Sequence, residues 1–277
     1  MEIKTVWSVY FSATGTTEKV VTTLAKTVAQ ELGAQYQTFS FNLPKSREDE
    51  LTFGPDDLVV MGVPVYAGRV PNLLLPYVRD KVKAQGALAI PVVLYGNRNF
   101  DDGLMELKNV MRDNGFMPVA AGAFVGEHSF STILGAGRPD ADDMALVDEL
   151  AHKAAEKVKG LTEAPTQAVE VEGCDPIRPY YTPRDRYGEP IKDFLKAKPK
   201  TDPDKCVKCG LCARLCPMGS IDPNDVSNVV GKCIKCCACV KKCPKGAKYF
   251  DHEGYLYHQH ELEDQYAGRR APSKILL

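Results

Sequence analysis

Eight of the ten cysteines form two copies of one spacing, C-x2-C-x2-C-x3-C followed by proline, 27 residues apart. The two copies consist of Cys206, Cys209, Cys212 and Cys216, and of Cys233, Cys236, Cys239 and Cys243. Thiolates at this spacing hold iron–sulfur clusters, and in the bacterial two-cluster pattern the fourth cysteine of each copy binds the other cluster. The spacing therefore predicts one [4Fe–4S] cluster on Cys206, Cys209, Cys212 and Cys243, and a second on Cys233, Cys236, Cys239 and Cys216.

Zinc is the main alternative ligand for these thiols. A zinc site would favour cysteine pairs at a different separation, or histidine ligands, and neither copy contains a histidine. Cys174 and Cys237 lie outside the repeated ligand positions, and we expect each to be a structural or free thiol. The first residues lack a signal peptide, and clustered thiols in such a chain are more typical of metal binding than of disulfides, so we expect a cytoplasmic protein.

The segment around the cysteines is basic, whereas the chain as a whole has a formal net charge of −1. Residues 201–250 hold nine Lys or Arg against four Asp, a balance of 9 − 4 = +5. This excess either compensates two anionic clusters or forms a docking face for an acidic redox partner. The overall charge predicts no nucleic-acid partner, and no apolar run reaches the ~20 residues of a membrane span.

A second chemical pattern lies near the N-terminus, where "FSATGTTEK" joins an apolar strand to a helix. Helix N-termini offer unpaired N–H groups to an anion, Gly15 allows close backbone approach, and hydroxyl side chains add donors. These residues suit a terminal monophosphate. The alternative is a hydroxyl-rich helix cap, because Ser and Thr favour that position in any helix.

Two further loops leave the next strands in "GVPVYAGRVP" (62–71) and "YGNRNFDDG" (95–103). In a parallel sheet both loops lie at the same end as the first loop, where ligands bind in open α/β folds. Tyr66 and Phe100 could supply faces for a planar aromatic ligand, and Gly68 and Gly96 expose backbone groups to its edge.

The elements that position these loops alternate along the first 160 residues. Apolar runs predict strands at 3–11, 35–41, 57–63, 87–95 and 117–125, with Pro91 unfavourable in the fourth. Helical spacing predicts helices at 17–32, 71–83, 101–114 and 139–159. Five strands alternating with helices predict an α/β fold with a doubly wound parallel sheet.

Residues 1–160 resemble the flavodoxin family, since Ser12–Thr17 matches its phosphate loop and "PVYAG" and "YGNRNF" match its two ring loops. The resemblance implies bound FMN, with Tyr66 and Phe100 flanking the ring and Gly96 and Asn97 at its polar edge. The FMN-binding residues it implies are Ser12, Ala13, Thr14, Gly15, Thr16, Thr17, Pro64, Val65, Tyr66, Ala67, Gly68, Tyr95, Gly96, Asn97, Arg98, Phe100 and Asp101. Residues 201–250 resemble a small α+β bacterial 2[4Fe–4S] ferredoxin. The whole arrangement resembles the fused flavodoxin–ferredoxin proteins of anaerobes, of EFR type.

Four segments follow: a flavodoxin-like domain at 1–160, a Pro- and Tyr-rich ordered strap at 161–200, a ferredoxin-like domain at 201–250, and a tail at 251–277 that packs back or frays. Two functions stay open. The chain could be an enzyme that reduces a small acceptor, with Glu127 and His128 as proton donors beside the ring, although one histidine in a loop more often bonds backbone. It could instead be a carrier that exchanges electrons only with protein partners. With either function, the chain could also form a homo-oligomer.

Overall fold

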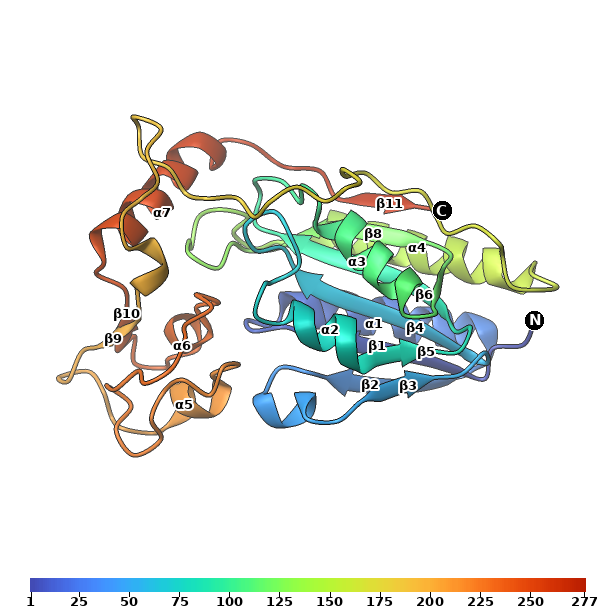
Figure 1. Cartoon of the computed structure of the whole chain (residues 1–277), viewed down its shortest axis with the longest axis horizontal. Coiled ribbons are helices and arrows are strands. Elements are labelled where there is room, and N and C mark those ends of the chain that lie inside the picture. The colour runs from blue at the N-terminus through green and yellow to red at the C-terminus, as the bar shows by residue number, and fades with distance from the viewer.

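Five parallel strands form the central sheet of a computed structural model that describes all 277 residues (Figure 1). They are β1 (Thr5–Tyr10), β2 (Gln35–Ser40), β4 (Asp57–Pro64), β6 (Leu88–Tyr95) and β8 (Ala121–Val125). Their order in space is β2-β1-β4-β6-β8, and β11 (Lys274–Leu276) extends the sheet antiparallel to β8. If only these five parallel strands are numbered along the chain, their order in space is 2-1-3-4-5, which is the doubly wound order of flavodoxin-like folds. The predicted fold class is confirmed.

Helices cover both faces of this sheet. α1 (Thr16–Leu32) and α4 (Ala141–Lys159) bury their apolar residues together against one face, and α2 (Leu75–Lys81) and α3 (Gly103–Asp113) cover the other. α1 ends at Gly33, whose left-handed φ of 65° suits a helix C-terminus. α4 begins with a capping box in which Asp140 and Asp143 each accept the other's backbone N–H.

β6 is buried along its whole length although Pro91 stands in its middle. In a parallel strand the N–H and C=O of one residue point to the same side, and every second residue points to the same neighbouring strand. The Ala89 carbonyl accepts the Val119 N–H, so Ala89 faces the segment at 117–125. Pro91, two residues later, faces the same segment. On that side the neighbouring strand is interrupted. β7 (Met117–Pro118) pairs with Leu88–Ala89, and β8 pairs with β6 only from Val92 onward. The N–H that proline lacks would therefore point at the gap between β7 and β8, where no strand pairing is lost. The single strand predicted at 117–125 is in fact these two strands.

Three short elements between β2 and β6 were not predicted. β3 (Leu51–Phe53) and β5 (Val82–Ala84) form a separate two-stranded parallel sheet, and η1 (Pro44–Arg47) is a 3-10 turn before them. The helix predicted at 71–83 is therefore shorter at both ends. Pro71 starts a turn rather than the helix, and the last predicted helical turn pairs with β3 instead.

Residues 161–200 run along the N-terminal domain and make specific contacts to it. The Val169 N–H bonds to the Pro118 carbonyl, and the Tyr181 N–H bonds to the Ala67 carbonyl. The Arg178 guanidinium holds the buried Asp102 carboxylate at 2.7 and 2.8 Å. A single 3-10 turn, η2 (Phe194–Lys196), lies near the end of this segment.

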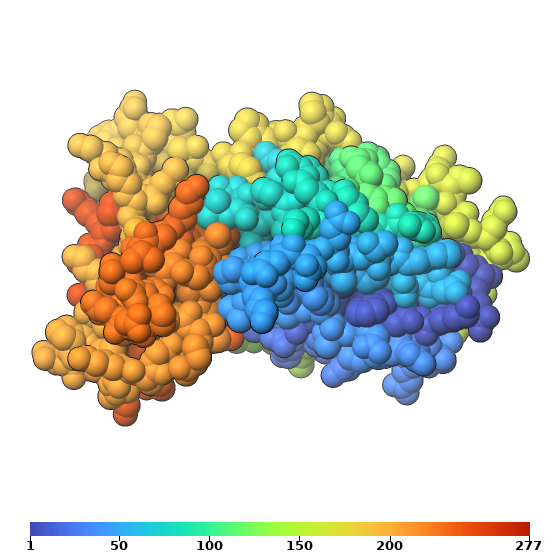
Figure 2. Space-filling model, turned by 60° about the horizontal axis from the view of Figure 1, so that its bottom comes forward, coloured from blue at the N-terminus to red at the C-terminus, as the bar shows by residue number.

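The cysteine-rich segment folds as a small lobe against one end of the N-terminal domain (Figure 2). It contains α5 (Leu211–Leu215), α6 (Ala238–Lys241) and an antiparallel pair, β9 (Lys200–Thr201) and β10 (Lys248–Tyr249). The sequence repeat reappears in the backbone, because left-handed residues recur 27 positions apart at 208 and 235, 210 and 237, and 219 and 246.

The tail packs back and does not fray. α7 (Glu253–Tyr266) lies beside the cysteine-rich lobe, and the chain then returns to the central sheet as β11 (Figure 1). Every helix of the chain is too short or too polar to cross a membrane. The tail thus joins the lobe to the N-terminal domain beside the strap, where Lys274 pairs with Glu172 at 2.7 Å (Figure 1).

Candidate functional site

The loop between β1 and α1 leaves several backbone donors free. The N–H groups of Thr14, Gly15, Thr16 and Thr17 donate no hydrogen bond to any protein group, and the N-cap residue Gly15 has no side chain that could cap α1. Ser12 instead takes a capping role, because its hydroxyl accepts the Glu18 N–H at 3.0 Å. Four free N–H groups at the positive end of a 17-residue helix fit a phosphate.

The loop after β4 forms a tight turn. Tyr66 and Arg69 exchange two backbone hydrogen bonds of 2.9 and 3.2 Å across Ala67 and Gly68, which both have positive φ. The N–H groups of Ala67 and Gly68 donate to no protein group, and both residues line the cleft described below. Gly68 has φ 79°, a left-handed conformation that favours glycine, and an added Cβ would meet the Asp101 carboxylate at 2.8 Å.

The loop after β6 differs from the prediction. Tyr95, Gly96 and Arg98 line the cleft, but Phe100 is buried in the core, where it packs on Tyr95 with ring centroids 5.6 Å apart. Phe100 therefore does not flank a ligand in this cleft. Asp101 also lies away from it, since its carboxylate pairs with Arg98.

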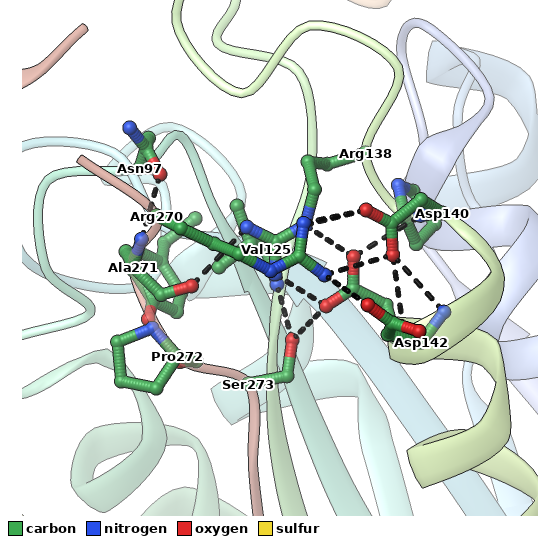
Figure 3. Close-up of polar contacts among 12 residues, drawn as sticks. Asn97, Val125, Arg138, Asp140, Asp142, Arg270, Ala271, Pro272 and Ser273 are labelled. Atoms are coloured by element: carbon green, nitrogen blue, oxygen red, sulfur yellow. Dashed lines mark hydrogen bonds and ion pairs between the residues drawn. The ribbon is translucent and has the colours of Figure 1, made fainter. Parts of the chain in front are cut away.

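Asn97 was expected at the polar edge of a ring, but its side chain holds the C-terminal tail (Figure 3). Its amide donates to the carbonyls of Tyr266 and Arg269 at 2.8 and 2.9 Å, and its carbonyl oxygen accepts the Ala271 N–H at 3.0 Å. With 2% exposure, this side chain has no polar atom left for a ligand. The tail therefore fixes the loop that carries Gly96 and Arg98.

These loops open into one cleft of about 1230 Å³ between the N-terminal domain, the strap, α7 and the cysteine-rich lobe. Thr14, Thr16, Thr17 and Tyr66 line it on one side, and Cys233 lines it on the other. Burial raises the pKa of the Tyr66 phenol, and the neighbouring thiols of Cys236, Cys237 and Cys233 add to the rise. The Tyr66 side chain thus lies between the cleft and the cysteines.

The eight repeated cysteines line two cavities. The first cysteine cavity contains Cys206, Cys209, Cys212 and Cys243. The second cysteine cavity contains Cys216, Cys233, Cys236 and Cys239, and Cys239 also reaches the first. This grouping matches the expected exchange of the fourth cysteines, while the ligand assignment itself stays a prediction.

The sulfurs of three of the repeated cysteines accept backbone hydrogen bonds, as cluster-bound thiolates do. Backbone N–H groups of Ser220, Lys235 and Ala247 donate to the sulfurs of Cys216, Cys233 and Cys243 at 3.3–3.4 Å, in an arrangement that stabilises thiolates. No three His, Cys, Asp or Glu side chains in the chain converge closely enough to hold one metal ion. Burial raises the pKa of Cys236 and of Cys239 to about 12. Bound iron would favour the thiolate form of both residues.

The two cavities differ in exposure. Cys209 is exposed beside the first cavity, whereas Cys236 is 6% exposed in the second. Aromatic rings from separate segments cover the second cavity: Phe250 stacks on Tyr255 at 4.2 Å, and Phe130 of the N-terminal domain lies 4.7 Å from Tyr255. The second cavity is therefore the one next to the cleft and shielded from water.

Cys237 belongs to this cover. Its φ of 57° is left-handed, and its counterpart in the first copy is Gly210, with φ 71°. The thiol lies 3.2 Å from the Tyr255 hydroxyl and is 3% exposed. Cys237 is thus a packed, buried thiol, whereas Cys174 is an exposed thiol in the strap.

Glu127 and His128, the predicted proton donors, are both engaged by protein groups. Glu127 pairs with Lys241 of the cysteine-rich lobe, and the His128 Nδ1 accepts the Phe130 N–H at 3.1 Å. Burial, followed by the positive charge of Lys241, lowers the pKa of His128 to about 3. A neutral imidazole is a poor proton donor at neutral pH, so the geometry favours the structural alternative for His128.

Several cleft residues could not be identified from the sequence. Tyr181 of the strap and His258 and Leu262 of α7 line the cleft, and Tyr181 stacks on His258 at 6.0 Å. These segments carry no binding motif, so only their aromatic content set them apart. From the sequence, Lys241 enters only the charge balance of residues 201–250. Its ion pair with Glu127 could not be predicted, because that pair depends on how the two domains pack together.

Residues 199–222, which contain the first cysteine copy, match the family described as a 4Fe-4S binding domain. This match supports a 4Fe–4S cluster and a redox role in the C-terminal region, and it does not reach the second copy. No curated protein matches the chain.

Among solved structures, a flavodoxin from the domain Archaea is 16% identical over 56% of this chain and 99% of its own, with a TM-score of 0.41. An NADH:FMN oxidoreductase in its apo form is 14% identical over 59% of this chain and 91% of its own, with a TM-score of 0.41. Rubredoxin oxygen:oxidoreductase from the anaerobe Desulfovibrio gigas is 15% identical over 57% of this chain and 37% of its own, with a TM-score of 0.38. These scores carry no functional argument, and the fold class follows from the strand order.

Proposed function

We propose that this chain is a redox protein that passes electrons between two [4Fe–4S] clusters and FMN and reduces a small acceptor in the cleft. It would belong with the fused flavodoxin–ferredoxin proteins of EFR type and act in the cytoplasm of an anaerobe. The family match at 199–222, the flavodoxin-like strand order and the free N–H groups at the start of α1 support this proposal.

The main observation behind the proposal is that the cleft and the second cysteine cavity share a lining residue. Cys233 lines both the cleft and the second cysteine cavity, and Tyr66 of the β4 loop lies against the same group of cysteines. A ligand bound on the loops at 14–17 and 64–68 would therefore lie in the cleft that Cys233 shares with the second cavity, with the Tyr66 side chain next to it.

When bound, the clusters would supply one-electron transfer and FMN one- or two-electron transfer. The N–H groups of residues 14–17 would hold the phosphate at the positive end of α1. The N–H groups of Ala67 and Gly68 would donate to the edge of the ring, and Tyr66 would cover the face turned to Cys233. The aromatic cover formed by Phe130 and Tyr255 would exclude water from the second cavity.

The size of the cleft favours an enzyme over a carrier. Single small-molecule sites usually measure ~300–1000 Å³, and this cleft measures about 1230 Å³. It therefore has room for a second ligand beside a flavin. A carrier that serves only protein partners would instead be expected to cover the flavin edge.

Cofactor content tests the proposal first. Anaerobically purified protein should contain about eight irons and about one FMN per chain. Mixing with substoichiometric dithionite should then distribute electrons over both the cluster and the flavin absorbance. Protein with fewer than about four irons, or with flavin that never equilibrates with the clusters, would refute the relay.

A pair of tyrosine variants tests the acceptor site. Tyr181→Ala removes a ring that lines the cleft, whereas Tyr187→Ala removes one that is 82% exposed and outside it. We expect Y181A to lower turnover of small quinone or nitro acceptors about tenfold, with flavin content unchanged, because the lost contact is on the substrate side. Equal turnover in both variants, or reoxidation only by a protein partner, would favour the carrier.

A further inference from the structure

The first cysteine cavity opens onto an exposed face with an apolar centre and a positive rim. Val207 is 60% exposed and Cys209 is exposed beside it. Lys208, Lys242 and Lys245 line the same cavity, and all three are exposed. We call these five residues the lysine-rimmed face.

The two cavities differ in charge as well as in exposure. Four lysines and no acidic residue line the first cavity, whereas no charged residue lines the second. Lysines also lie near the second cavity, since Lys235 adjoins Cys233 of its wall, but Lys235 and Lys241 are both bonded inside the protein. What distinguishes the first cavity is that three of its four lysines are exposed.

Three other lysines of this lobe serve its internal structure. Lys235 donates to the Leu195 carbonyl at 3.0 Å, Lys241 binds the loop at 127–131, and Lys248 is 3% exposed and bonded to the Val226 carbonyl. The lysines of the exposed rim have no ion-pair partner. Asp225 lies close enough to influence Lys208, but Ser227 already binds its carboxylate.

We infer that the lysine-rimmed face docks a small one-electron carrier protein with an acidic surface. This inference rests on the proposed function. An apolar centre with a charged rim is the usual anatomy of a protein interface, and complementary charge steers the encounter. In the exchange one electron leaves the reduced metal centre of the carrier and enters the first cavity's cluster; no bond forms or breaks and no proton moves.

The test uses the full holoprotein and an oxidised acidic bacterial 2[4Fe–4S] ferredoxin as the probe. Binding is measured by calorimetry at low and at physiological salt for three proteins: the parent, the triple variant K208Q/K242Q/K245Q, and the control K26Q/K153Q/K159Q. The control removes the same charge from exposed lysines of the N-terminal domain. We expect the rim variant to bind about tenfold more weakly at low salt, and the control to bind like the parent.

The outcomes separate this inference from the relay. Equal affinity in both triple variants, or parent binding that does not weaken with salt, would overturn the docking face. Binding of the parent to anionic phosphatidylglycerol vesicles but not to the ferredoxin, lost in the rim variant, would overturn it in favour of a membrane surface. In each case dithionite would still reduce clusters and flavin, whereas a failed relay would leave the flavin oxidised while the ferredoxin binds normally.

Discussion

At the scale of single residues, His128 shows how a chemically suggestive side chain becomes structural. Its ring lies against Gly96, where an added Cβ would approach the ring at 2.3 Å, and its Nδ1 accepts a backbone N–H. Lys241 donates to its carbonyl at 2.6 Å. Contacts with Gly96 and with the Phe130 N–H thus hold the imidazole in its neutral form, and the nearby positive charge of Lys241 opposes its protonation.

This arrangement predicts a pH dependence of stability. The folded pKa of about 3 lies below the ordinary value of 6.5, so the contribution of His128 is complete above pH 6.5 and is lost as pH falls toward 3. Between about pH 7.5 and about pH 5.5 the parent should lose about 1 kcal/mol, or ~2–4 °C in Tm, through this group. In His128→Asn, which keeps an acceptor for the Phe130 N–H, that part of the loss should vanish.

His152→Asn is the matched control, because its side chain is 59% exposed on α4. Its Tm should fall with pH as in the parent. If H128N and the parent show the same fall, His128 binds its proton equally in the folded and unfolded states, and a role as proton donor becomes tenable again.

At the scale of elements, the C-terminal tail is the part that holds the ring loop in place. Arg138, labelled in Figure 3, forms a buried ion pair with Asp143, and both residues contact the tail just before β11. The Asp143 carboxylate also accepts the Ser273 hydroxyl at 2.7 Å, and Arg138 donates to the Ala271 carbonyl at 3.2 Å. Because Ala271 is in turn bound by Asn97, the tail connects α4 to the loop after β6.

Arg138→Met should release this connection. It leaves the Asp143 carboxylate buried without its partner, which costs about 3–5 kcal/mol, and we expect the tail to become sensitive to proteolysis and FMN affinity to fall. Arg270→Met is the control. Arg270 also binds a carboxylate, Asp140, but is 51% exposed, so its loss should cost less than about 1 kcal/mol. Equal effects of both changes would mean that burial of the ion pair does not anchor the tail.

Strands and helices with a clear periodic pattern of apolar residues could be predicted from the sequence. Elements that form only because they pair with a distant segment could not. The five main strands and α1 follow from their own apolar patterns. β11 and β5 have only three residues each, and each exists because a distant segment offers it hydrogen bonds. The cysteine grouping followed from spacing alone. The displacement of Phe100 and Asn97 from the cleft did not, because it depends on the core beneath the loop and on a tail about 170 residues away.

At the scale of the whole molecule, one lysine joins the two domains next to the proposed relay. Lys241 of α6 is 15% exposed, pairs with Glu127, and donates to the carbonyls of His128 and Ser131 at 2.6 and 2.8 Å. All three acceptors belong to the loop after β8. This contact fixes the distance between the second cysteine cavity and the cleft, which an electron would have to cross.

Lys241→Met should loosen that contact without touching a cluster ligand. Hydrogen bonds to a charged group contribute roughly 1.5–3 kcal/mol, so a loss of about 2 kcal/mol would raise the population of separated domains roughly 30-fold. We expect faster hydrogen exchange at residues 126–131 and slower electron equilibration between cluster and flavin absorbance after rapid reduction. Lys242→Met provides the control, since Lys242 is exposed and its backbone N–H bonds to Ala238 within its own lobe. If K241M and K242M equilibrate at the same rate, the cavity and the cleft are held together by other contacts, such as Lys235 on the strap and Arg47 on the Pro217 carbonyl.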